Sequence, residues 1–106
     1  MRGPFMLRPL QVDMSVPCRV GGVYGLGKDS RQVRFVGFAD RNVREAIKSH
    51  WNEYEFFWFQ PCLSARDAYL RVCQQYHKQM ENGGLDVEEH PAAPAGVTEK
   101  CPVCGK

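Results

Sequence analysis

The chain of 106 residues has no long hydrophobic run, no internal repeat and no dense cluster of basic residues. No stretch approaches the ~20 consecutive apolar residues that a membrane-spanning helix needs. The first residues also lack the charged head and apolar core of a secretion signal. We therefore expect a soluble cytoplasmic protein with no membrane partner, whose length suits one compact core with an appendage.

A disulfide framework is not expected either. The cysteines are odd in number and follow no secretion signal, which favours reduced thiols. They are Cys18, Cys62, Cys73, Cys101 and Cys104.

Charge is unevenly distributed along the chain. Residues 1–78 contain 12 basic and 7 acidic side chains, whereas residues 79–106 contain 2 and 5. A basic body suits a phosphate-bearing partner, although this charge density alone does not indicate nucleic-acid binding.

Composition divides the chain into three parts. Residues 1–19 contain three prolines and follow neither a helical nor a strand period, which predicts an irregular N-terminal arm. Residues 82–106 form an acidic linker, rich in proline and alanine, that ends in a Cys-x-x-Cys knuckle. The folded domain is expected between them, over residues 20–81.

The pattern within residues 20–81 predicts the order β-β-α-β-α. Two β-rich segments, residues 20–26 and 32–37, flank a Gly-Lys-Asp-Ser turn and predict a hairpin. Apolar residues recur at the helical period over residues 43–50 and 65–80. The aromatic run over residues 55–59 predicts a strand between these helices. The expected fold class is α/β, with a small three-stranded mixed sheet.

Two short motifs on the predicted hairpin carry a family resemblance. They are Gly22-Val23-Tyr24 on the first strand and Phe35-Val36-Gly37 on the second. Together with the helix, the aromatic strand and the helix opened by Ser64, they resemble the GIY-YIG nuclease domain over residues 20–80. The resemblance implies a metal-dependent site for phosphodiester cleavage, built from two tyrosines, an arginine and a glutamate.

Carried over position by position, the resemblance leaves this site incomplete. Tyr24 matches the first tyrosine, but Phe35 stands at the second and has no hydroxyl. Val72 stands where a glutamate would hold the metal. Ala46 stands at the arginine, although Arg44 or Arg41 could reach the pocket if the register slips. We therefore expect a remnant pocket at Tyr24, Phe35 and Val72, and a domain that is not an enzyme.

A degenerate domain of this kind is expected to act in nucleic-acid binding or as an accessory of a nucleoprotein complex. The residues expected to contact nucleic acid are Tyr24, Arg41, Arg44, Lys48 and Arg66. Two alternatives stay open. One is a protein-interaction subunit that docks on a larger assembly through its tail, and the other is an active metal-dependent endonuclease with relocated catalytic residues.

The C-terminal knuckle predicts a structural zinc ion. Cys101 and Cys104 have the spacing at which two thiolates bind one ion, and a closed zinc site needs four ligands. Cys73 and His77, one turn apart on the second helix, are the best internal candidates for the other two. A second knuckle from a partner chain and a metal-free pair of thiols are the alternatives. His90, in the linker, has no expected partner.

Overall fold

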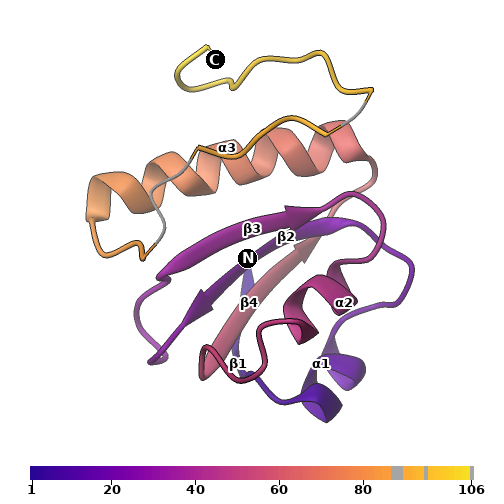
Figure 1. The fold of residues 1–106 in the computed structure, drawn as a ribbon, viewed down its shortest axis with the longest axis vertical. Coiled ribbons are helices and arrows are strands. Elements are labelled where there is room, and N and C mark those ends of the chain that lie inside the picture. The colour runs from indigo at the N-terminus through magenta and orange to yellow at the C-terminus, as the bar shows by residue number, and fades with distance from the viewer. Residues whose placement is uncertain (87–89, 95, 106) are drawn as a thin grey trace.

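The computed structural model describes residues 1–86, 90–94 and 96–105. In this part of the chain, four strands and three helices form one α/β unit (Figure 1). None of the described helices combines the length and the hydropathy that a membrane crossing requires. The elements are β1 (Arg2–Met6), α1 (Pro9–Ser15), β2 (Gly22–Gly27), β3 (Phe35–Ala39), α2 (Val43–Lys48), β4 (Phe56–Pro61) and α3 (Ala65–Asn82).

The sheet has four strands in the order β1-β4-β2-β3, and every neighbouring pair is antiparallel. The predicted sheet of three mixed strands is therefore wrong in strand number and in direction. After the β2–β3 hairpin, α2 brings the chain to the far side of β2. There β4 pairs with β2 rather than with β3, to which it would have been parallel.

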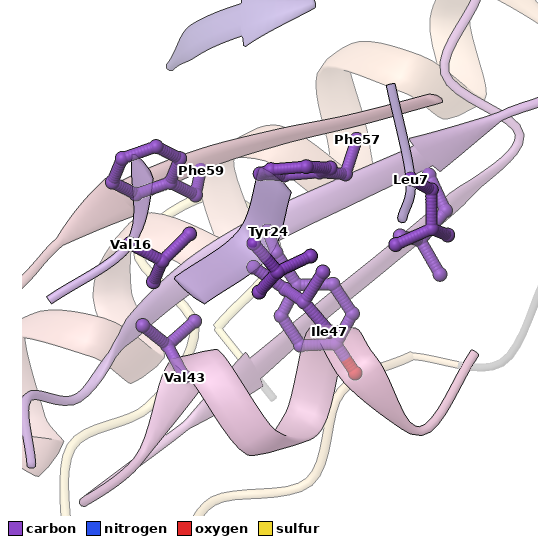
Figure 2. Packing of buried hydrophobic residues seen from close by; sticks show 9 residues of the cluster. Leu7, Val16, Tyr24, Val43, Ile47, Phe57 and Phe59 are labelled. Carbon is purple, nitrogen blue, oxygen red and sulfur yellow. The ribbon is translucent and has the colours of Figure 1, made fainter. Parts of the chain in front are cut away.

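Helices cover both faces of the sheet (Figure 1). Because side chains alternate along a strand, Tyr24 and Leu26 of β2 point toward α1 and α2, whereas Val23 points toward α3. Figure 2 shows the first of the two resulting cores. This core 1 consists of Leu7, Val12, Val16, Tyr24, Leu26, Val43, Ile47, Phe57 and Phe59. Core 2, beneath α3, consists of Val23, Cys62, Ala68, Tyr69, Val72, Cys73 and Cys101.

The N-terminal arm is regular, contrary to the prediction. Its residues form the edge strand β1 and the helix α1, and they contribute Leu7, Val12 and Val16 to core 1. The prolines led to the prediction of an irregular arm, but two of them occupy positions where a strand or a helix tolerates proline. Pro4 lies on an edge strand, and Pro9 opens α1, where its missing N–H would have no helical partner anyway.

Helices α2 and α3 each begin at a residue whose side chain caps the first turn. The Asn42 side chain accepts a hydrogen bond from the Glu45 amide at the start of α2. Ser64 Oγ accepts one from the Asp67 amide at 3.0 Å, which begins α3 as the sequence predicts. After Gly83 the described tail has no helix or strand. Of the predicted linker and knuckle, residues 87–89, 95 and 106 lie outside the described residues.

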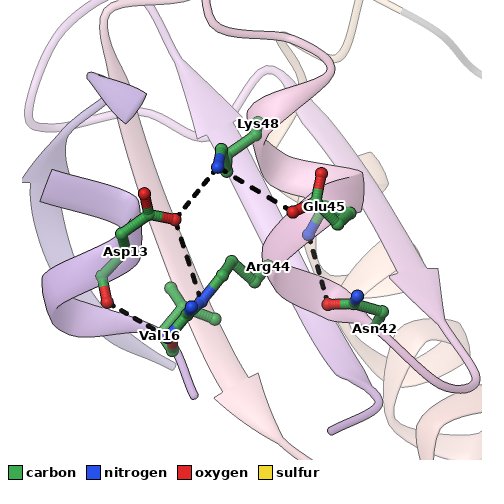
Figure 3. A network of polar contacts seen from close by, with 6 residues as sticks. All are labelled: Asp13, Val16, Asn42, Arg44, Glu45 and Lys48. Carbon is green, nitrogen blue, oxygen red and sulfur yellow. Dashed lines mark hydrogen bonds and ion pairs between the residues drawn. The ribbon is translucent and has the colours of Figure 1, made fainter. Parts of the chain in front are cut away.

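A polar network fastens α1 to α2 (Figure 3). The Arg44 guanidinium donates to the backbone carbonyls of Val16 and Asp13, at 2.8 and 3.1 Å. Lys48 Nζ lies 3.0 Å from the Asp13 carboxylate and 3.8 Å from that of Glu45. These cations therefore close the C-terminal end of α1, where carbonyl groups lack helical partners.

We expect Arg44→Ala to lower the free energy of unfolding by about 1–3 kcal/mol, because two backbone carbonyls lose charged donors. Arg41→Ala is the matched control, since Arg41 is exposed and has no partner among the described residues. It should change stability by less than about 0.5 kcal/mol. Urea denaturation followed by circular dichroism measures both. Equal stability of the two variants would contradict the structural role of Arg44.

Candidate metal centre

The residues of the predicted remnant pocket do not converge. The Tyr24 ring stacks on Phe35, with ring centroids 6.1 Å apart. It passes over Gly37, where a Cβ atom would lie 2.6 Å from the tyrosine hydroxyl. Burial and the nearby Glu53 raise the pKa of Tyr24 to about 12, so its hydroxyl stays protonated at neutral pH. Val72 lies on the other side of the sheet, in core 2.

Three of the four cations predicted to bind nucleic acid have carboxylate partners. Arg44 and Lys48 hold α1, as described above. Arg66 Nε lies 2.6 Å from the carboxylate of Glu99 in the tail. These three side chains are thus engaged in contacts within the protein, and Tyr24 is buried.

Arg41 is the predicted cation that stays free of such contacts among the described residues. It lines a cavity of about 690 Å³ together with Arg19. The cavity lies between three connecting loops at one end of the sheet, around residues 19–21, 40–42 and 62–64. Asp40 also lines it, so its charged side chains carry a net charge of +1.

Four metal-ligating side chains meet where the tail returns to α3. They are His77 of α3 and His90, Cys101 and Cys104 of the tail, and their ligand atoms all lie within 4.8 Å of one another. Figure 1 shows the tail running alongside α3. In the described part of the chain, this is the group of histidine, cysteine and acidic residues able to hold a metal ion.

Each of the two imidazoles has an Nε2 atom that is free to bind a metal ion. His77 Nε2 is buried and has no hydrogen-bond partner among the described residues. The Nδ1 of His90 lies 2.8 Å from the carbonyl of Pro91, and its Nε2 lies 3.4 Å from Cys104 Sγ. A carbonyl at Nδ1 selects the tautomer that leaves the Nε2 lone pair free for a metal. Each ring therefore has one nitrogen available to a metal ion.

The knuckle holds its two sulfurs in a tight turn. The Gly105 amide donates to the Cys101 carbonyl at 2.9 Å, and Gly105 takes a φ of 75°, which suits glycine. Burial disfavours a charged Cys101. Hydrogen bonds from the backbone amides of Cys104 and Val103 outweigh burial and lower the pKa of Cys101 to about 5. The lowered pKa favours the thiolate of Cys101, which is the form that binds metals.

Cys73, the predicted fourth ligand, is replaced by His90. Cys73 lies on the expected face of α3, but it is fully buried in core 2 and is not one of the four residues of the group. Burial raises its pKa to about 12, so it remains a neutral thiol. His90 was missed because a linker rich in proline and alanine has no period that fixes where its side chains point. The structure thus brings together His77, Cys101 and Cys104 of the predicted set.

Comparison of the chain with protein-family models, with curated proteins and with solved structures finds no match.

Proposed function

We propose that the protein binds one zinc ion through His77, His90, Cys101 and Cys104, and that the ion fastens the C-terminal tail to α3. The main support for this proposal is the environment of the Nε2 atom of His77. It is a buried polar atom with no hydrogen-bond partner among the described residues. Leaving such an atom unpaired costs about 1–3 kcal/mol, which a metal bond would offset.

The types of ligand favour zinc. Two thiolates and two imidazoles in a tetrahedral arrangement are typical of structural zinc sites, whereas calcium and magnesium require oxygen ligands. With Zn–S bonds of ~2.3 Å and Zn–N bonds of ~2.0 Å, neighbouring ligand atoms lie about 3.3–3.8 Å apart. The distance of 3.4 Å between Cys104 Sγ and His90 Nε2 fits this range.

Asp86 at the start of the tail pairs with Arg34 and Tyr54, but the described residues after it make few other contacts. Among the described tail residues, Cys101 belongs to core 2, Val97 packs against it, and Glu99 pairs with Arg66 on the surface. An exposed ion pair contributes little, about 0–1 kcal/mol. Ordering the backbone of one residue costs roughly 1–2 kcal/mol. Metal binding supplies free energy that orders the ligand-bearing segment.

Purified wild-type protein should contain about one equivalent of zinc by inductively coupled plasma mass spectrometry. Replacing a ligand, as in His90→Ala or Cys104→Ser, should lower the metal content or weaken zinc binding at least tenfold in a competition with a chelator. Both residues lie in the tail, so the α/β unit should keep its circular dichroism spectrum.

Two cysteine variants control this experiment. Cys18→Ser removes an exposed thiol that is not part of the group, and Cys73→Ala removes a buried thiol that shares core 2 with Cys101. Both should retain the zinc content of the wild type. A wild type without zinc after purification and after addition of Zn²⁺ would refute the proposal, and loss of zinc from Cys73→Ala would return Cys73 to the ligand set.

Nucleic-acid binding is the second candidate function, and the free Arg41 favours it. The resemblance of residues 20–80 to a GIY-YIG domain suggests a phosphodiester ligand. Arg41 and Arg19 line one cavity and make no hydrogen bond or ion pair with the other described residues. Both guanidinium groups are thus available to phosphates.

The double variant Arg19→Ala/Arg41→Ala should weaken binding to a short DNA duplex. The slope of log affinity against log salt concentration should fall by an amount that corresponds to about two phosphate contacts. The matched control is Arg8→Ala/Arg31→Ala, which removes two exposed cations away from this cavity. Fluorescence anisotropy between ~50 and ~200 mM salt measures both. Equal salt dependence in the two double variants, or no binding by wild type at ~50 mM salt, would contradict this function.

A further inference from the structure

A third thiol lies beside the proposed zinc site without belonging to it. Cys73 and Cys101 are both buried in core 2, at 0% and 2% exposure. Cys101 is also within 4.8 Å of Cys104. Cys101 is thus placed between an exposed thiol on one side and a buried thiol on the other.

We propose that oxidation by a peroxide replaces the metal with a disulfide between Cys73 and Cys101, so that the tail stays attached to α3 by a covalent bond. This inference rests on the proposed zinc site, because oxidation would replace the zinc–sulfur bonds of that site with a disulfide. The zinc-bound and the oxidised protein then share the same position of Cys101.

The reaction begins at the exposed sulfur. The Cys104 thiolate attacks one oxygen of hydrogen peroxide, the O–O bond breaks, and a sulfenic acid and hydroxide result. The Cys101 thiolate attacks the Cys104 sulfur and displaces a second hydroxide, which forms a Cys101–Cys104 disulfide. Peroxide is thereby reduced to two waters, two thiols are oxidised, and zinc loses both sulfur ligands.

Cys73 then completes the exchange. Hydroxide released from the peroxide takes the proton of the Cys73 thiol. The resulting thiolate attacks the Cys101 sulfur and displaces Cys104 as a thiolate, so the number of disulfides stays at one. The geometry favours this product because Cys73 and Cys101 already lie together in core 2. The new bond closes a long loop between α3 and the tail, which constrains the unfolded chain more than a bond between neighbouring turn residues does.

Trypsin distinguishes the two possible disulfides. Cleavage after Arg71, Lys78 and Lys100 places Cys73 in residues 72–78, and both knuckle cysteines in residues 101–106. A Cys73–Cys101 bond joins the two peptides, whereas a Cys101–Cys104 bond closes the second peptide on itself. Mass spectrometry of alkylated, non-reduced digests separates these products.

The experiment treats zinc-loaded wild type with about two equivalents of hydrogen peroxide and follows released zinc with a chromogenic chelator. We expect about one equivalent of zinc to be released, and the joined peptides to be the main product. In Cys73→Ala, zinc release should continue, with the internally closed peptide as the product. Cys18→Ser should behave as wild type.

The internally closed peptide as the main final product in wild type would overturn the inference. So would joined peptides in which Cys62 or Cys18 replaces Cys73. Failure of the zinc site is read separately, from the metal content of the reduced protein before peroxide is added. If that protein holds zinc and the joined peptides do not form, the zinc proposal stands and the exchange is refuted.

Discussion

The position of β2 between β4 and β3 determines where every other part of the protein lies. Hydrogen bonds on both edges hold this strand, and its side chains alternate between the two cores. Tyr24 and Leu26 anchor the layer of α1 and α2, whereas Val23 anchors α3. Because α3 packs on the sheet, His77 of this helix lies close to the ligand residues of the tail. The candidate metal centre therefore depends on the same strand as the core.

The packing of the core does not by itself explain the position of the tail. Its described residues form no helix or strand, yet they bring one imidazole and two thiols to a single residue of α3. Cys101 is nearly fully buried, and His77 keeps a buried nitrogen without a described partner. The proposed zinc ion would account for both observations, because it would pair the nitrogen and order the segment that carries the other ligands.

Much of the domain can be predicted from local patterns. The hairpin, the cap at Ser64 and the period of α3 are properties of short segments, and the structure contains them. The edge strand β1 and the helix α1 escaped prediction because tertiary contacts, rather than a local period, bury Leu7 and Val12. The antiparallel pairing of β4 with β2 likewise depends on the path of the chain through α2, which local sequence patterns do not predict.

The same distinction applies to the candidate metal centre. The knuckle spacing identifies Cys101 and Cys104, and the spacing along α3 places Cys73 and His77 on one face. Sequence spacing does not show that Cys73 lies in the core, or that His90 approaches from a segment without a period. The site that the family resemblance implies fails for a related reason, because matching residues along the chain does not place Val72 and Tyr24 on one face of the sheet.

The central claim is that one ion is bound by two sulfurs and two nitrogens of a single chain. X-ray absorption spectroscopy at the zinc edge of the reduced, loaded protein tests it most directly. The account predicts two sulfur scatterers at ~2.3 Å and two nitrogen scatterers at ~2.0 Å. A shell of three sulfurs and one nitrogen would place Cys73 in the site. A shell of four sulfurs would indicate knuckles from two chains, and either result would contradict the account.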